Sequence, residues 1–190
     1  MREITSKKSI DALFNCPLRK LIEDWQLQIP DILQVKFLTE NCGLAKALNI
    51  GLALCSHEIV ARMDADDISL PIRFEIQVKY LIDNPHLTCC GARAELIDDK
   101  NTRTAIKYMP EHHHQIFDCA KFRNPIIHPS SAFRKYAILD VGGYPDFRTS
   151  QDYALWSVLL NKGYIFENLP IVLLQMRAGD ALLKRRGLKY

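Results

Sequence analysis

The sequence predicts a layered α/β domain, and two observations lead to this fold class. Short apolar runs of the β-strand type alternate with stretches in which apolar residues recur at helical spacing, which is the pattern of a sheet covered by helices. The 190 residues are 48% hydrophobic and 25% charged, a composition typical of globular proteins and too apolar for a disordered chain. No linker rich in glycine, serine or proline divides the sequence, so we expect one domain over residues 1–190.

The first half of the chain is expected to alternate between helices and strands. Ser9–Asn15 and Pro17–Gln28 have helical patterns, and the second begins with proline, a residue favoured in the first turn of a helix. Three further elements follow: a strand at Ile32–Leu38, a helix at Leu44–Leu54 and a strand at Glu58–Met63. The last of these is an apolar run with β-branched residues, which indicates burial on both faces.

The second half continues the alternation. A helix is expected from Pro71 to about Asp83, where Asn84-Pro85 ends it because proline disfavours a helical residue before it. The residues expected on the core side of this helix are Phe74, Val78, Tyr80, Leu81 and Ile82. The remaining elements are strands at Leu87–Ile97 and Thr102–Tyr108, a helix near His112–Lys121, a strand around Ile126–Phe133, a turn at Gly142-Gly143-Tyr144, a helix at Gln151–Asn161 and an extended segment at Tyr164–Met176.

The formal net charge of +3 is unevenly spread. Arg177–Tyr190 holds five basic residues and one acid, a net charge of +4, so the rest of the chain carries −1. A near-neutral body argues against general nucleic-acid binding, which needs a broad basic face. The basic end suits a phosphate, a diphosphate or an acidic membrane surface, and a solvated terminal helix is the plainer alternative.

The sequence also predicts a cytoplasmic protein. Residues 1–10 lack the apolar core of a signal peptide, and no run reaches the roughly 18 apolar residues that span a membrane. The six cysteines form no C-x-x-C pair, so we expect them to be reduced. The basic end is compatible with a peripheral position on the inner face of the cytoplasmic membrane.

A cluster of carboxylates follows the strand at Glu58–Met63. Asp64, Asp66 and Asp67 come directly after it, ahead of the helix that opens with Pro71. In open α/β sheets ligands bind at the carboxyl edge, and like charges held this closely repel unless a cation lies among them. Side chains at the end of a strand point in different directions. Asp64 can therefore accept a hydrogen bond from a hydroxyl group while Asp66 binds a divalent cation. The alternative is that these residues, Asp67 above all, only cap the following helix.

Several motifs point together to one enzyme family. They are N-x-G-L-A-x-A-L-N-x-G at Asn41–Gly51, the stretch Glu58–Gln77, N-P-I-I-H-P-S-S-A-F-R-K at Asn124–Lys135, V-G-G-Y at Val141–Tyr144, Q-D-Y-A-L-W at Gln151–Trp156 and K-R-R-G at Lys184–Gly187. In this order and at these distances the chain resembles family 2 of the inverting glycosyltransferases. The likeness is to the bacterial branch that builds exopolysaccharide and O-antigen repeat units.

The resemblance implies a GT-A fold, a Rossmann-like sheet with flanking helices that binds a nucleotide-diphosphate sugar. It implies transfer of the sugar, with inversion, to a polysaccharide or to a saccharide on a polyprenyl diphosphate lipid. Mn²⁺ or Mg²⁺ is the implied cofactor, with Asp66 as its ligand and Asp64 at the donor ribose. The other implied donor-binding residues are Arg62, Lys46, Asn49, Arg185 and Arg186.

By the same resemblance, Asp152 would be the catalytic base. An inverting transfer needs a carboxylate that takes the proton of the acceptor hydroxyl, and the family places it in a Glu-Asp pair at a helix start. Here Gln151 replaces the glutamate, and Gln151 and His128 are the expected acceptor contacts. Two plainer interpretations stay open, with Asp152 as a helix-start acid and His128 as a hydrogen-bonded core residue.

Two strands of the family are missing from the N-terminal part of this pattern. The resemblance implies a first strand of the S-V-I-I-P-x-Y-N kind and a second that ends in Asp-Asp-Gly, and the sequence has neither. We therefore expect an incomplete sheet with exposed apolar edges. Two other function classes stay open: a catalytically impaired remnant that binds a partner or a membrane, and a nucleotidyltransferase or related metal-dependent enzyme.

Overall fold

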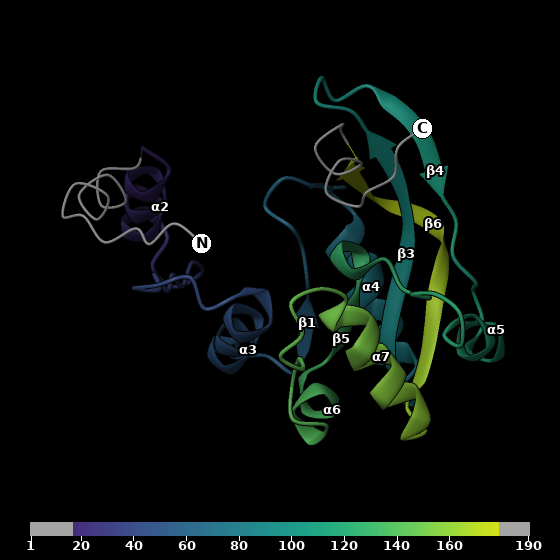
Figure 1. Ribbon diagram of the computed structural model, residues 1–190. Helices are drawn as coiled ribbons and strands as arrows, with labels where there is room; N and C mark the ends of the chain where they lie inside the picture. Colours follow the sequence, from purple (N-terminus) through teal and green to yellow (C-terminus); the bar gives the residue numbers. More distant parts are fainter. Residues whose placement is uncertain (1–16, 179–190) are drawn as a thin grey trace. The chain divides into compact units, whose positions relative to one another are not determined.

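Figure 1 shows the computed structural model of the chain, which describes residues 17–178. The chain divides into two units between Cys42 and Gly43, and each unit is described by itself. The single domain expected over the whole chain stays a prediction, and the helix expected at Ser9–Asn15 lies outside the described residues. In the part of the chain that the structure describes, no helix has the length and apolar character needed to cross a membrane.

The first unit contributes one described helix, α2, at Pro17–Gln28, with the predicted bounds and no buried residue. The prediction of a strand at Ile32–Leu38 is wrong, because residues 29–42 form turns and irregular backbone. The N–H groups of Ile32 and Leu33 turn back to the carbonyl of Ile29, at 3.1 and 2.9 Å. A strand requires a neighbour with which to form its ladder, and residues 17–42 contain none.

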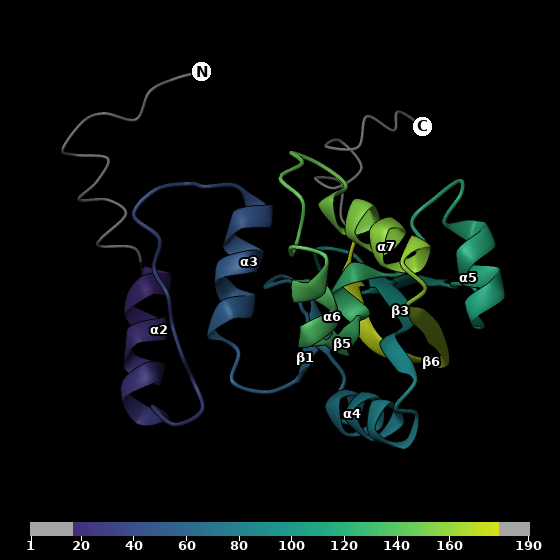
Figure 2. The ribbon, with the colours of Figure 1, turned by 90° about the horizontal axis from the view of Figure 1, so that it is seen from below.

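The second unit contains a six-stranded sheet with helices on both faces (Figures 1 and 2). Its elements are α3 at Leu44–Leu54, β1 at Ile59–Ala61, β2 at Ile68–Ser69, α4 at Arg73–Asp83, β3 at Leu87–Ile97, β4 at Arg103–Lys107, α5 at His113–Cys119, the 3₁₀ turn η1 at His128–Ser130, β5 at Ala132–Arg134, α6 at Lys135–Asp140, α7 at Gln151–Asn161 and β6 at Ile165–Arg177. The strand order is β1-β5-β3-β6-β2, and β4 pairs with β3. Only β3 and β6 run parallel; the other pairs are antiparallel.

The core lies on both faces of the central strand β3. Cys89 packs on one face with Trp156 of α7 and Phe166 of β6, and the two rings meet edge to face at 5.6 Å between centroids. Cys90 packs on the other face with Leu81 of α4. Successive residues of a strand point to opposite faces, so this one strand supplies both layers of the core. Figure 2 shows α4 on one side of the sheet and α6 and α7 on the other.

Strand β1 lies at one edge of the described sheet and is shorter than expected. It pairs with β5 alone, and all three of its residues are only half-buried. The prediction that Glu58–Met63 is buried on both faces is therefore wrong. A strand with a neighbour on one side only has less of its surface covered by the sheet and by the helices that pack on it.

The segment Ile126–Phe133 is not one strand, as the sequence pattern had suggested. Pro129 lacks an N–H for a ladder and lies in the 3₁₀ turn η1, so β5 begins only at Ala132. Helix α6 follows directly at Lys135, and the sequence pattern did not indicate it. The expected turn at Gly142-Gly143-Tyr144 is present, with both glycines at positive φ.

Helix α4 buries polar side chains where apolar ones were expected. Leu81 is buried as predicted, whereas Phe74 and Ile82 are exposed, and the prediction for these two is wrong. Arg73 and Gln77 are fully buried in their place. Arg73 donates to the carbonyl of Arg62, and Gln77 donates to the carbonyls of Cys90 and Ser130. Buried carbonyls require such partners.

Gly91 allows the side chain of Asn168 to cross between the parallel strands β3 and β6. The two residues are partners in the ladder. The amide nitrogen Nδ2 of Asn168 donates to the carbonyls of Pro110 at 2.6 Å and Pro125 at 3.1 Å. A Cβ atom on Gly91 would lie only 1.9 Å from Asn168 Oδ1, so any side chain at this position displaces the asparagine.

We predict that Gly91→Ala lowers the free energy of unfolding by about 2–3 kcal/mol, because overpacking and the displaced amide act together. Gly51→Ala is the matched control: Gly51 lies inside α3 and no other atom lies within 4 Å of the added Cβ. That change should raise stability by up to about 1 kcal/mol, since alanine favours helices. Urea unfolding of both variants measures the difference, and similar effects in the two would contradict the role of Gly91.

Candidate active site

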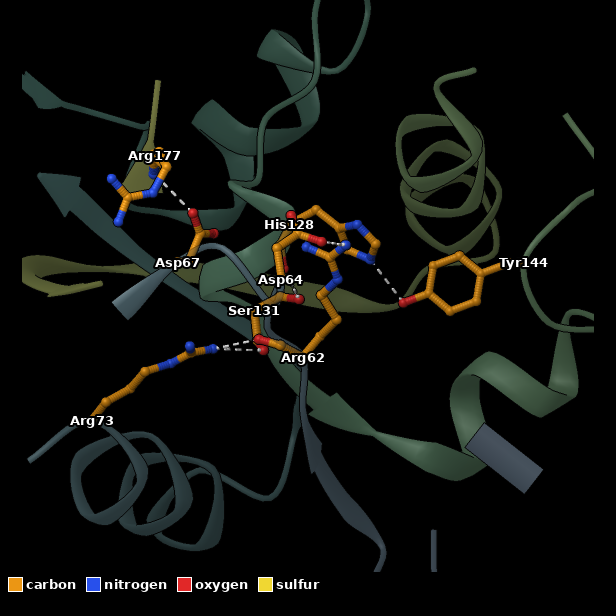
Figure 3. Close-up of polar contacts among 8 residues, drawn as sticks. All are labelled: Arg62, Asp64, Asp67, Arg73, His128, Ser131, Tyr144 and Arg177. Carbon is orange, nitrogen blue, oxygen red and sulfur yellow. Dashed lines mark hydrogen bonds and ion pairs between the residues drawn. The ribbon is translucent and has the colours of Figure 1, made fainter. Parts of the chain in front are cut away.

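Three carboxylates lie together in the turn between β1 and β2. Figure 3 shows two of them, Asp64 and Asp67. One oxygen from each of Asp64, Asp66 and Asp67 lies within 4.8 Å of the others. Asp66 is exposed, Asp64 is half-buried and Asp67 is buried. The structure thus brings together the three aspartates that the sequence singled out, with one of them reaching into the protein.

Asp67 carries a buried oxygen that lacks a hydrogen-bond partner. Its Oδ1 accepts the N–H of Arg177 at 2.8 Å, while Oδ2 has none. Burial, and after it the charges of Asp64 and Asp66, raises the pKa of Asp67 to about 6. Helix α4 has no side-chain cap, so Asp67 is not a helix cap. A buried carboxylate oxygen beside two other carboxylates fits a hard divalent cation, which would satisfy it and offset the repulsion.

Arg62 supplies a buried positive charge beside the acidic turn. Its guanidinium forms an ion pair with Asp64, and two of its other nitrogens, Nε and Nη1, are buried without hydrogen-bond partners. Its backbone N–H donates to the carbonyl of Ser131 at 2.9 Å, and its carbonyl accepts from Arg73 at 2.7 Å. This cation reduces the repulsion among the carboxylates. Its expected contact with a donor stays a prediction.

Arg177, at the end of β6, holds the acidic turn in place. Its guanidinium donates to the carbonyl of Asp66 at 3.1 Å, to the carbonyl of Asp98 at 2.7 Å and to Oδ1 of Asn101 at 2.6 Å. These bonds tie the acidic turn to the turn between β3 and β4. Because three of its donor nitrogens are engaged with the protein, the side chain acts here as a clamp.

Asp152, the expected base, lies half-buried in the first turn of α7. Asn124 Nδ2 donates to its Oδ2 at 2.6 Å, and Asn124 Oδ1 in turn accepts the N–H of Ile126 at 3.2 Å. Among the described residues, no hydrogen bond is formed to Oδ1 of Asp152. The asparagine therefore fixes the direction of the carboxylate and occupies one oxygen, while the other stays available. A residue that only stabilised the helix dipole would need no such partner.

A buried histidine–tyrosine pair lies close to the acidic turn and to Asp152. His128 Nε2 and Tyr144 Oη are 2.9 Å apart (Figure 3). The ring of Trp156 packs edge-on against His128. Burial, together with the charge of Arg62, lowers the pKa of His128 to about 3, so this ring is neutral at ordinary pH. Burial raises the pKa of Tyr144, which Arg62 lowers and Asp152 raises. The tyrosine hydroxyl thus lies within electrostatic reach of Arg62 and of Asp152.

Several expected contacts have a different position in the structure or lie outside it. His128 and Gln151 are only 6% and 7% exposed, so the structure does not support their expected contact with an acceptor. His128 matches the other interpretation, a hydrogen-bonded core residue. Arg185 and Arg186, expected to bind the donor, lie outside the described residues.

The two residues of α3 that were expected to bind the donor differ in their surroundings. Asn49 Oδ1 accepts the N–H of Tyr144 at 2.8 Å, and its Nδ2 donates to the carbonyl of the same residue at 2.9 Å. Its amide is therefore used to hold the turn at Gly142-Gly143 against α3. Lys46 is exposed, with its ammonium 4.0 Å from the carboxylate of Asp146, and its contact with a donor stays a prediction.

Sequence reasoning missed the partner of Asp152. Asn124 precedes Asp152 by 28 residues, and its only signal was its place at the start of the N-P-I-I-H-P motif. It also underestimated Asp67, which looked like a helix cap and proves to be the most buried member of the acidic turn.

Comparison with known proteins identifies the family. The model of "Glycosyl transferase family 2" matches residues 17–142, which is more than half of the chain. The chain belongs to glycosyltransferase family 2. It is 38% identical over 174 residues to the amylovoran biosynthesis glycosyltransferase AmsE of Erwinia amylovora, covering 91% of this chain and 64% of the relative. It is 35% identical over 184 residues to the UDP-Gal:alpha-D-GlcNAc-diphosphoundecaprenol beta-1,3-galactosyltransferase of Escherichia coli, covering 95% and 65%.

Solved structures confirm the GT-A fold of this family 2 chain. The mannosyltransferase PcManGT of Pyrobaculum calidifontis, in complex with GDP-Man and Mn²⁺, matches 90% of the chain with a TM-score of 0.61 and 21% identity. TarS 1–349 of S. aureus, in complex with UDP-GlcNAc, matches 86% with a TM-score of 0.63 and 16% identity. The chain spans 46% and 47% of these two structures and just under two thirds of the relatives named above.

We predict that this family 2 chain loses stability as the pH falls below the usual range of histidine. The pKa of His128 is about 3 in the fold against 6.5 ordinarily, so the unfolded chain takes up a proton that the folded chain excludes. From about pH 6 to about pH 4 the loss should be about 2–3 kcal/mol. His128→Gln should remove this part of the dependence in urea unfolding, whereas His86→Gln, at an exposed histidine, should leave it. A His128→Gln variant with the unchanged pH dependence would show that His128 is protonated in the fold.

Proposed function

We propose that this chain transfers a sugar from a nucleotide-diphosphate sugar to a polysaccharide or lipid-linked saccharide acceptor, with inversion. The observation that carries the proposal is the acidic turn, in which a buried, unpartnered oxygen of Asp67 lies beside Asp64 and Asp66. The names of the relatives support the substrate class: one acts in amylovoran biosynthesis, and another transfers from UDP-Gal to GlcNAc-diphosphoundecaprenol.

The acidic turn would hold the donor. Asp66 and Asp67 would offer carboxylate oxygens to Mn²⁺ or Mg²⁺, and Asp64 would accept a hydrogen bond from a ribose hydroxyl of the donor. When bound, such an ion neutralises the negative charge that develops on the departing diphosphate. The ion pair with buried Arg62 holds Asp64 in place for this contact. The P. calidifontis mannosyltransferase, whose structure is a complex with GDP-Man and Mn²⁺, supports a divalent cation as the cofactor.

Asp152 would act on the acceptor. Oδ1 of its carboxylate takes the proton of the attacking hydroxyl, and the oxygen of that hydroxyl forms a bond to the anomeric carbon. The bond from that carbon to the diphosphate breaks on the opposite face, and the nucleoside diphosphate leaves with the electron pair. Asn124 holds Oδ2 throughout, so the carboxylate keeps its direction while Oδ1 gains the proton.

We predict that the acidic turn binds nucleotide only with the help of a divalent cation. UDP and GDP should bind at least about tenfold more tightly with Mn²⁺ than without it, and Asp66→Ala should remove this gain, since the cation loses a ligand. Titration calorimetry measures both, with and without the metal. Asp83→Ala, an exposed acid on α4 paired with Lys79, is the control and should keep the gain. Equal nucleotide affinity in the parent with and without Mn²⁺, or an Asp66→Ala variant that keeps the gain, would rule out the metal assignment.

We predict that Asp152→Asn reduces turnover by at least about 10²-fold, which is the usual scale for loss of a general base. Donor affinity should be unchanged, since the base acts on the acceptor. Asp146→Asn, at an exposed carboxylate in the loop before α7, is the matched control. Turnover is measured as release of nucleoside diphosphate in the presence of an acceptor. Near-normal turnover in Asp152→Asn would remove this residue from the mechanism.

A non-catalytic module that binds a partner is the second candidate, and one observation favours it. Helix α2 has no buried residue, although Leu18, Leu21 and Trp25 are all apolar and exposed. Such side chains are ordinarily covered by another surface. Absence of turnover with every donor, combined with intact Mn²⁺ and nucleotide binding, would favour this candidate.

A further inference from the structure

Two phenylalanine rings project from the loops beside the N-terminal end of α7. Phe122, between α5 and β5, is 86% exposed, and Phe147, between α6 and α7, is 58% exposed. Phe122 is the most exposed large hydrophobic side chain in residues 17–178. A single exposed apolar residue is ordinary and needs no explanation. What distinguishes these two is their shared position and the charges around them.

Both loops are attached to the first turn of α7. The hydroxyl of Tyr153 donates to the carbonyl of Ala120 at 2.6 Å, and Asn124 donates to Asp152 at 2.6 Å, so two bonds hold the first loop. The second loop continues directly into α7 at Gln151. Both loops therefore adjoin the turn of α7 that carries the carboxylate proposed as the base.

Each ring is followed in the sequence by an exposed arginine. Arg123 comes after Phe122 and Arg148 after Phe147, and neither arginine has a carboxylate partner among the described residues. The guanidinium of Arg123 only donates to Sγ of Cys119, at 3.4 Å. Both arginines are therefore free of ion pairs with which a phosphate group would compete.

Two of the acids near the rings are already paired with lysines. Asp118 lies 2.7 Å from Lys121, and Asp146 lies 4.0 Å from Lys46. With the two arginines and the carboxylate of Asp152, four basic and three acidic side chains lie around these loops, which gives a net charge of +1. This combination of aromatic rings and excess positive charge complements an anionic membrane surface, where rings enter the headgroup region and arginines contact phosphates.

The opposite face of the sheet offers a contrast, because helix α4 also exposes apolar side chains there. Phe74 and Ile82 of α4 are exposed, but acidic residues, Glu75 and Asp83, follow them in the sequence. Acidic residues repel an anionic surface. Exposure alone therefore does not distinguish a membrane-binding face, and α4 supplies a matched control.

We propose that Phe122, Phe147, Arg123 and Arg148 form a surface that docks on an anionic phospholipid bilayer. The two rings enter the headgroup region, and the two arginines contact lipid phosphates. This inference rests on the proposed function, because it gives the lipid-linked acceptor a route to the base: docking in this orientation brings Asp152 to the membrane surface on which such an acceptor is held.

Vesicle co-sedimentation tests this surface directly. The full chain should bind vesicles of phosphatidylglycerol and phosphatidylcholine and lose binding in high salt, since exposed charges are screened. The double variant Phe122→Ser/Phe147→Ser should bind at least about tenfold more weakly, because two rings no longer leave water. The control Phe74→Ser/Ile82→Ser should bind like the parent. Circular dichroism melts establish that both variants are folded.

A charge variant provides a second, independent measurement. Arg123→Gln/Arg148→Gln should lose most of the preference for phosphatidylglycerol over phosphatidylcholine alone while keeping the rings. Unchanged binding in the phenylalanine variant, equal loss in the α4 control, or equal binding of the parent to phosphatidylcholine alone would overturn the proposal. If the chain instead bound vesicles through another exposed apolar face, such as that of α2, vesicle binding would be unchanged in the phenylalanine variant.

The proposed function is tested by separate measurements of binding and transfer. Nucleotide and Mn²⁺ binding, and transfer to a water-soluble acceptor, should be the same in the parent and in the phenylalanine variant, because none of the changed residues contacts the donor site. Transfer to an acceptor embedded in vesicles should fall with the binding. If the parent shows no transfer at all while the vesicle results are as expected, the docking surface stands and the glycosyltransferase proposal fails.

Discussion

The acidic turn depends on two buried polar side chains of α4. Arg73 donates to the carbonyls of Arg62 and Ser131, at 2.7 and 3.4 Å (Figure 3). Gln77 donates to the carbonyl of Ser130 at 2.8 Å. These carbonyls lie where β1 and η1 end, directly behind the carboxylates. Burial lowers the pKa of Arg73 to about 10, so it still carries its charge at neutral pH. Leaving such carbonyls unpaired costs about 1–3 kcal/mol each.

The arrangement of charge explains why this part of the core is polar. Arg62 and Arg73 are buried cations behind the turn, and Asp64 and Asp67 lie between them and the surface. Buried ion pairs contribute little net stability, because desolvation offsets their attraction. The buried arginines fix the carboxylates in place, so that the cluster can bind a cation and a diphosphate without rearranging. Burial, and after it the charge of Arg62, lowers the pKa of His128 and keeps its ring neutral.

Sequence reasoning succeeded where a pattern is local and failed where it depends on distant partners. The bounds of α3, β3 and α7 agree with the prediction, since each has a continuous pattern of its own. The acidic turn was predictable because its three members are neighbours in the sequence. The inner face of α4 was not, because hydrophobicity alone favoured Phe74 and gave no account of the carbonyls that Arg73 satisfies. The contact between Asn124 and Asp152 likewise joins loops that only the fold brings together.

The predicted strand at Ile32–Leu38 is absent and the one predicted at Glu58–Met63 is shorter, and both errors have the same cause. An alternating or apolar run reports which side chains a strand would bury, but a ladder forms only between two strands. β3 has β4, β5 and β6 as neighbours, extends over 11 residues and is mostly buried. β1 has one neighbour and extends over three half-buried residues, and Ile32–Leu38 forms no strand. A strand thus forms only where a partner strand lies beside it, which no pattern within the strand itself can report.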